Sequence, residues 1–266
     1  MLSVECEGVR DPPMKRQLLL GAAVGVLAAI APAAVSPARA ASPVFTWTGF
    51  YVGANAGYSW GTGTVNYNEP ALGGLGLPTS ITGSNKLDGV IGGGQIGYNW
   101  QFDNAWVAGL EADLQGANEK GSTDFSYFSG VEGITGSLSS SIQWFGTVRG
   151  RVGWLFNPTT MVYATGGLAY GRVTAAGSFT SSPATPCGVC TWSFNDAAIN
   201  VGWTVCGGVE GAFPNLPNMT WKIEYLYIDL GSISGSGFDT AFGGPYSWNA
   251  KFTDNIFRAG VNWHYP

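Results

Sequence analysis

Apolar and polar residues alternate with a period of two in eight separate segments of the chain. The last segment shows the pattern clearly, because Phe257, Ala259 and Val261 alternate with Arg258 and Gly260. Successive side chains of a β-strand point to opposite faces, so the alternation predicts strands with one apolar and one polar face. The segments expected to be strands are 50–60, 94–101, 106–115, 142–154, 161–172, 201–213, 221–227 and 257–265.

The connections between these segments alternate between short and long. The short ones carry Asn, Asp and Pro in positions typical of turns, at 102–104, 155–159 and 214–218. The long ones are polar and are expected to be loops, at 61–86, 116–137, 174–198 and 231–251. Short periplasmic turns and long outer loops are typical of outer-membrane barrels. We therefore predict an all-β fold, an eight-stranded antiparallel up-and-down transmembrane β-barrel of OmpA/OmpX-like size, with both termini on the periplasmic side.

Large aromatic residues lie near the predicted strand ends on the apolar face. They are Trp60, Trp100, Trp106, Trp144, Trp154, Trp221, Tyr227, Trp263 and Tyr265. Interfacial Trp and Tyr form girdles at the two headgroup levels of such barrels. In the fourth segment, Ile142 is expected on this lipid-facing side, opposite Gln143. A soluble sandwich is one alternative, and a soluble eight-stranded ligand barrel, with an apolar lumen and a polar exterior, is another.

The N-terminal region has the three parts of a secretory signal peptide. Lys15 and Arg16 precede an apolar stretch, which ends before a small-residue cleavage motif at Ala38 to Ala40. We interpret residues 14–40 as a cleaved signal peptide, residues 1–13 as lying upstream of the true start at Met14, and residues 41–266 as the mature barrel. Export through the general secretory pathway to the bacterial outer membrane follows from this interpretation.

The mature chain keeps 8 of the 12 Lys and Arg and 14 of the 17 Asp and Glu, so its net charge is near −6. This mild acidity argues against a nucleic-acid partner. Eight charged residues fall on the inward faces of the predicted strands. They are Glu111, Asp113, Glu210 and Glu224 with Arg149, Arg151, Lys222 and Arg258. Eight strands leave a lumen only just wide enough for side chains, so we expect a closed ionic network and little or no conductance.

Two further motifs suggest chemistry that their context does not favour. Residues 92–97 match G-x-G-x-x-G, but the segment continues as strand rather than helix, so we expect no dinucleotide site. Cys187 and Cys190 form a C-x-x-C in a long loop, where export to an oxidising compartment predicts a local disulfide. Cys206 is expected to be a free, buried thiol, and His264 an interfacial polar residue.

Several strand sequences resemble the Omp25/Omp31-like outer-membrane proteins of α-proteobacteria, a family of porin-like surface antigens. The similar stretches are 47–53, 55–61, 163–171, 221–227 and 255–262. The resemblance implies a porin-like surface antigen of the outer membrane. The leading hypothesis is a structural envelope protein with exposed loops. The alternatives are a small porin-like channel and a receptor that binds a haem-like ligand through its aromatic and Gly-rich loops. We expect no enzyme activity, cofactor or metal. The expected partners are outer-membrane lipid, lipopolysaccharide and the barrel-assembly machinery, and the sequence names no host partner or small-molecule ligand.

Overall fold

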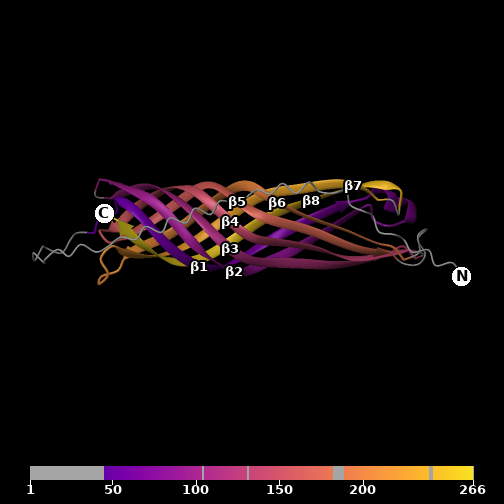
Figure 1. Ribbon diagram of the computed structural model, residues 1–266, viewed down its shortest axis with the longest axis horizontal. Coiled ribbons are helices and arrows are strands. Elements are labelled where there is room, and N and C mark those ends of the chain that lie inside the picture. The colour runs from indigo at the N-terminus through magenta and orange to yellow at the C-terminus, as the bar shows by residue number, and fades with distance from the viewer. Residues whose placement is uncertain (1–44, 104, 131, 182–188, 240–241, 266) are drawn as a thin grey trace, which may run out of the picture. The chain divides into compact units, whose positions relative to one another are not determined.

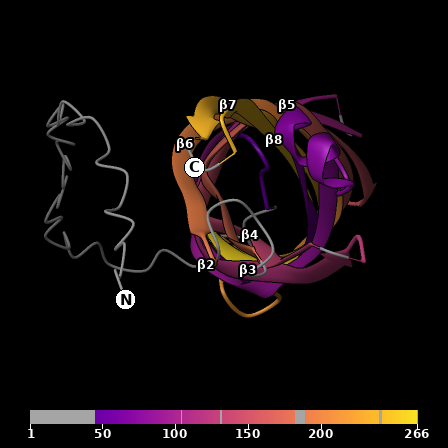
Figure 2. The same cartoon turned by 90° about the vertical axis from the view of Figure 1, so that its right-hand side faces the viewer.

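The computed structural model describes residues 45–103, 105–130, 132–181, 189–239 and 242–265, and these residues form a closed barrel of eight antiparallel strands. Each strand pairs with the next, and β8 pairs with β1 to close the ring (Figures 1 and 2). The predicted fold class is confirmed. The strands are β1 (Gly49–Asn68), β2 (Ser80–Phe102), β3 (Trp106–Phe128), β4 (Gly133–Asn157), β5 (Thr160–Ser181), β6 (Thr191–Ala212), β7 (Met219–Asp239) and β8 (Gly244–Tyr265).

Helical structure is minor in this part of the chain. A short 3-10 helix, η1 (Pro70–Leu75), follows β1. No helix among the described residues is long and apolar enough to cross a membrane.

Tight turns join the strands at the end of the barrel where β8 finishes. β2 leads to β3, β4 to β5 and β6 to β7 within a few residues, as the sequence predicted. Asp103 and Asn218 have φ angles of 65° and 66° in two of these turns. Asp and Asn tolerate this left-handed conformation better than most residues, which explains their presence here. We call this the turn end of the barrel.

The strands are about twice as long as the sequence predicted. They contain 20 to 25 residues each, whereas a tilted transmembrane strand needs about 9–11. The interpretation of 61–86, 116–137, 174–198 and 231–251 as loops is therefore wrong for most of those residues. They extend the barrel beyond its membrane-spanning part as an outer wall of paired strands.

The outer wall was missed because the polarity of the two strand faces is exchanged there. In β1 the outward Tyr58 and Trp60 are 46% and 44% exposed, whereas further along the strand the apolar Val65 and Tyr67 point inward and are buried. In β8 the outward Phe257 is exposed and the inward Phe252 is buried. Ser, Thr, Asn and Gly on the outer surface gave these segments the composition of loops.

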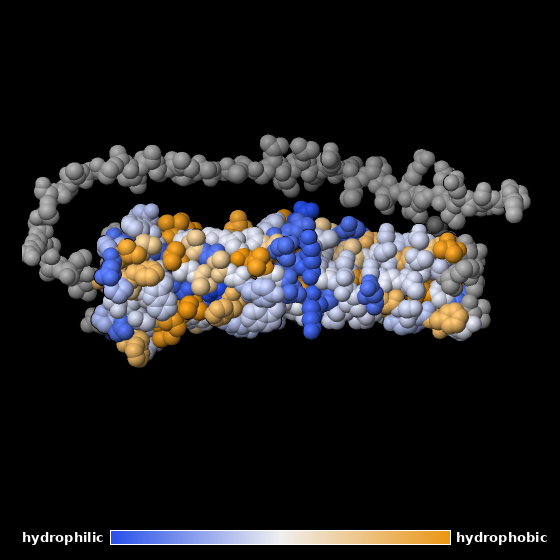
Figure 3. Space-filling view, turned by 90° about the horizontal axis from the view of Figure 1, so that it is seen from below, coloured by the Kyte–Doolittle hydropathy of each residue, from blue (hydrophilic) through white to orange (hydrophobic). Residues whose placement is uncertain are grey.

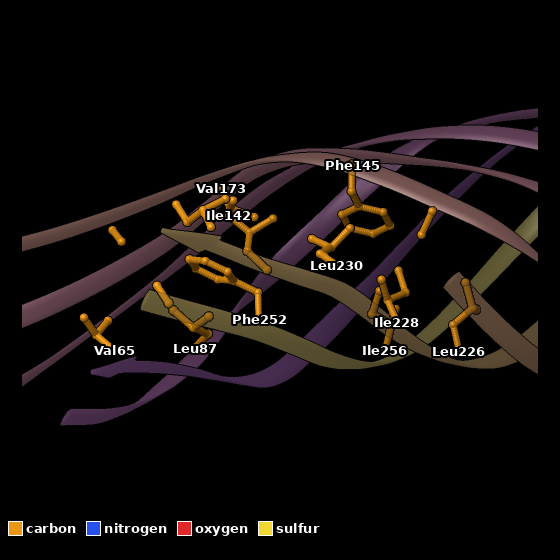
Figure 4. Close-up of a cluster of buried hydrophobic side chains, with 14 of the residues drawn as sticks. Val65, Leu87, Ile142, Phe145, Val173, Leu226, Ile228, Leu230, Phe252 and Ile256 are labelled. Atoms are coloured by element: carbon orange, nitrogen blue, oxygen red, sulfur yellow. The ribbon is translucent and has the colours of Figure 1, made fainter. Parts of the chain in front are cut away.

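Apolar side chains fill the lumen of the outer wall. Val65, Leu87, Ile142, Phe145, Val173, Leu230 and Phe252 come from six of the eight strands and point into the interior (Figure 4). This is the arrangement expected of a soluble barrel, with an apolar lumen and a polar exterior. One chain thus combines a transmembrane barrel with a water-exposed barrel built on the same strands.

Ile142 does not face lipid, contrary to the prediction. It is 2% exposed and inward, while Gln143 points outward. The register of β4 shifts between Ile142 and Trp144 relative to β5, at a β-bulge. One extra residue in a strand reverses the face of everything beyond it, which strict period-two reasoning cannot anticipate.

The hydrogen-bonded ladder of the outer wall is open between β6 and β7. The ladder between these strands ends at Trp203 and Asp229, although both strands continue and remain paired on their other sides. Gly231, with φ 72°, and a register shift between Asp229 and Gly231 bend β7 at this point. Asn200 bridges the start of the opening by donating to the carbonyl oxygen of Leu230 at 2.5 Å. We call this opening the β6–β7 seam.

Candidate functional site

Two rings of aromatic side chains encircle the barrel. Near the turn end, Tyr98 contacts Phe50 and Trp100, each at 4.6 Å between ring centroids. Further out, Trp203 contacts Tyr227 at 5.3 Å. Exposed aliphatic and aromatic side chains cover the wall between the rings; among them are Ile96, Leu110, Leu114, Val148, Leu168, Val205, Ile223 and Phe257. Such a continuous apolar band between aromatic girdles belongs in lipid.

The lumen of this membrane-spanning part contains all eight charged residues that the sequence placed inward. Each is at most 4% exposed, and the structure brings them into one connected cluster, which we call the ionic network. Glu111 is its centre. It pairs with Arg149, lies 3.1 Å from Lys222 Nζ, and accepts a hydrogen bond of 2.8 Å from the hydroxyl of Tyr51.

The remaining members of the network extend it across the lumen. Arg258 bridges two acids, with Nε 2.7 Å from Glu224 Oε2 and Nη2 2.9 Å from Asp113 Oδ2. Arg149 also reaches Asp113 Oδ2, at 2.9 Å. Arg151 pairs with Glu210 at the side nearer the turn end. Four acids and four bases therefore compensate one another, which buried charges require.

Neutral side chains that the sequence analysis did not single out complete this polar layer. Asn55 donates to Gln95 at 2.5 Å, Gln95 donates to Asn262 at 2.8 Å, and Asn262 donates to Glu210 at 2.8 Å. The Tyr163 ring lies 3.8 Å from the guanidinium carbon of Arg151, a cation–π contact. Their inward position in the alternation was the signal that could have identified them.

Glycine provides the space that the large charged side chains need. Six of the eight network residues lie directly opposite a glycine on a neighbouring strand. The pairs are Glu111 with Gly97, Arg149 with Gly167, Arg151 with Gly109, Lys222 with Gly260, Glu224 with Gly208 and Arg258 with Gly57. A Cβ at Gly167 would collide with the carbonyl oxygen of Val148 and lie 2.8 Å from Arg149 Cα. The glycines of the inward face are thus a packing requirement of the network.

The turn end of the lumen is closed by residues that precede β1. Trp47 is fully buried there, and its indole N–H donates to the carbonyl oxygen of Pro158 at 3.2 Å. Phe45 and His264 pack against it, with ring centroids 4.9 and 6.0 Å away. His264 is 4% exposed, so its assignment as an interfacial residue is wrong. It points inward, 3.1 Å from the hydroxyl of Thr220.

The remaining motifs and cysteines noted in the sequence can now be located in the fold. Residues 92–97, the G-x-G-x-x-G match, lie within β2 and continue as strand. Cys206 is free and buried, 3.6 Å from Glu224 Oε1. Cys190 is disulfide-bonded, and Cys187, its predicted partner, lies outside the described residues. Among the described residues, no group of three or more His, Cys, Asp and Glu side chains could hold a metal ion.

Stacked aromatic rings fill the far end of the outer wall. Phe179 lies 4.5 Å from Tyr67 and 5.3 Å from Trp192, and Phe194 lies 5.0 Å from Trp248, measured between ring centroids. Glu69 is buried beside this cluster, where it accepts a hydrogen bond of 2.8 Å from the Tyr67 hydroxyl. Burial, together with the nearby carboxyl of Asp239, raises the pKa of Glu69 to about 7.

Glu69 is therefore expected to make this end sensitive to pH. A carboxyl whose pKa is higher when folded than when unfolded favours the closed form fully at low pH and progressively less as pH rises. Between about pH 4.5 and 7, local opening of residues 66–80 should increase by up to about 80-fold in wild type relative to E69Q. Amide hydrogen exchange, corrected for intrinsic rates, measures this local opening. Identical pH profiles for wild type and E69Q would refute the expectation.

The closed barrel, its apolar band and its two girdles define a transmembrane β-barrel of the bacterial outer membrane. Comparison with known proteins agrees. Residues 22–264 match the family described as outer membrane protein beta-barrel domain, and the chain belongs to this family.

Among its relatives is the 31 kDa outer-membrane immunogenic protein of Brucella melitensis, which is 36% identical over 86% of this chain and 88% of the relative. The 22 kDa outer membrane protein of Rhizobium leguminosarum is 30% identical over 82% of this chain and 78% of the relative. The predicted resemblance and the outer-membrane location are confirmed. Of the solved structures, OprG from Pseudomonas aeruginosa covers 84% of this chain and all of its own, with 11% identity and a TM-score of 0.49.

Proposed function

We propose that this chain is a surface protein of the envelope whose barrel does not conduct, and whose outer wall, rather than its lumen, carries the function. The observation that supports this most directly is the filling of the lumen along its length. Trp47 closes the turn end, the ionic network fills the membrane-spanning part, and apolar side chains fill the outer wall. Two packed layers of different chemistry in series oppose the passage of an ion.

The channel hypothesis is tested by recording from purified, folded monomer in planar bilayers. We expect no steady conductance from wild type. We also expect none from E111Q, because the apolar seal around Phe145, Leu230 and Phe252 does not depend on the network. Large, steady conductance from wild-type monomer, with folding verified by heat-modifiable gel mobility, would overturn the proposal.

The surface role is tested by tagging the two ends of the barrel. A short epitope inserted at Gly243, in the connection between β7 and β8, should react with antibody on intact cells. The same epitope at Leu216, in the turn between β6 and β7, should react only after the outer membrane is permeabilised. The reverse result would place the outer wall in the periplasm and remove the proposal.

A further inference from the structure

The cations of the described residues fall into two sets with different surroundings. Of eight Lys and Arg side chains, four belong to the ionic network. The other four, Lys86, Lys120, Arg172 and Lys251, point outward and are exposed. They lie on different strands, which are β2, β3, β5 and β8.

Strand register places these outward cations immediately beyond the outer aromatic girdle. Arg172 pairs directly with Trp144 across β4 and β5. Trp60 pairs with Asp88, and Asp88 pairs with Lys120 on the next strand. Lys86 therefore lies two residues further out along β2. On the face drawn in Figure 3, a hydrophilic belt crosses the barrel between the apolar part and the paler outer wall.

Lys251 completes the belt near the β6–β7 seam. Its Nζ lies 3.3 Å from Asp229 Oδ2, and Asp229 pairs with Trp203 of the girdle. We call Lys86, Asp88, Lys120, Arg172, Asp229 and Lys251 the collar. The collar carries four cations and two acids, so its net charge is positive. The described residues as a whole are acidic, with 8 Lys and Arg against 14 Asp and Glu.

Two open grooves adjoin collar cations. One, of about 430 Å³, is lined by Lys120 and by Ser122, Ser139, Ser141 and Thr174. The other, of about 400 Å³, lies at the base of the seam between Trp203, Ser232 and Lys251. A cation beside hydroxyl-lined or aromatic walls suits a phosphorylated sugar better than a bare phosphate, because the sugar can use the remaining surface.

We infer that the collar binds the phosphate groups of the phosphorylated glycolipid, lipopolysaccharide, in the outer leaflet. The outer girdle marks the end of the hydrocarbon layer, so the collar lies at the depth where the lipid phosphates of that leaflet begin. The inference rests on the outer-membrane location, on register and on the proposed orientation with the outer wall outside the cell, and it does not depend on whether the barrel conducts.

The experiment compares the folded protein in detergent micelles with lipid A carrying two phosphates, with dephosphorylated lipid A, and with inorganic phosphate, by native mass spectrometry or titration. Wild type should bind the diphosphorylated lipid at least tenfold more tightly than the dephosphorylated one. Each Lys or Arg near an anionic surface contributes roughly fivefold in affinity. The variant K86Q/K120Q/R172Q/K251Q should therefore lose at least tenfold, with unchanged heat-modifiable mobility.

The control variant D124N/D196N changes exposed acids on the outer wall and should bind as wild type does, or slightly more tightly. Equal binding of both lipid forms, or full binding by the quadruple variant, would overturn the inference. Inorganic phosphate that competes at a concentration equal to that of the lipid would also overturn it, because the collar would then be a simple anion site. If the quadruple variant fails to fold, the single variants K120Q and K251Q, which alter one groove each, provide the same comparison.

Discussion

Replacing Glu111 with Gln is expected to destabilise the folded barrel by about 3–5 kcal/mol, because one buried acid then no longer compensates the cations around it. Glu111 pairs with Arg149 and Lys222 and accepts the hydroxyl of Tyr51. The amide keeps the shape of the side chain and removes only its charge, so cavity formation does not contribute. Denaturant unfolding in detergent micelles, followed by tryptophan fluorescence, measures the effect.

The matched control for this variant is D124N. Asp124 lies on β3, as Glu111 does, but is exposed on the outer wall. Its replacement should change stability by no more than about 0.5 kcal/mol. If E111Q unfolds at the same denaturant concentration as D124N, the ionic network does not stabilise the barrel and its charges must be compensated in another way.

Replacing Gly167 with Leu is expected to prevent the barrel from closing, with a folded yield below about one tenth of wild type. A Cβ at this position meets the backbone of Val148 and Arg149, which cannot move without breaking the β4–β5 ladder. The adjacent Gly166 provides the control, because it faces outward and a Cβ there has only ordinary contacts of 3.7 Å or more. The measurement is the folded fraction on heat-modifiable gels.

G166L should fold to about the wild-type yield, since its side chain enters lipid. The two variants add the same residue to neighbouring positions of one strand, so they differ only in the face that receives it. Equal yields for G166L and G167L would mean that the inward glycines are not needed for packing of the network.

The membrane-spanning half of the fold could be predicted from sequence because its two faces differ so strongly. Ile96 and Leu110 alternate with Gln95 and Glu111, and no other environment accommodates both faces. The members of the ionic network followed from the same alternation. Their individual ion pairs could not be predicted. Which acid meets which base depends on strand register and barrel closure, and a register shift of one residue changes the pairs.

The outer wall could not be predicted in the same way. Its inward set, for example Val65, Ile81 and Leu138, is spread among Gly, Ser and Thr, so each segment has the composition of a loop. The bulge at Ile142 and the burial of Trp47 and His264 depend on contacts between distant parts of the chain. The β6–β7 seam likewise has no local signal beyond Gly231, one of many glycines.

The outer wall consists of paired strands, so in the proposed orientation a molecule that approaches the cell meets side chains from distant parts of the sequence. Thr64 of β1, for example, lies between Ser84 of β2 and Lys251 of β8. An antibody or receptor that binds such a patch recognises an assembled epitope, which exists only while the strands stay in register. Linear peptides copied from any one strand would lack the side chains of its neighbours, so sera raised against them should bind the denatured chain and not intact cells.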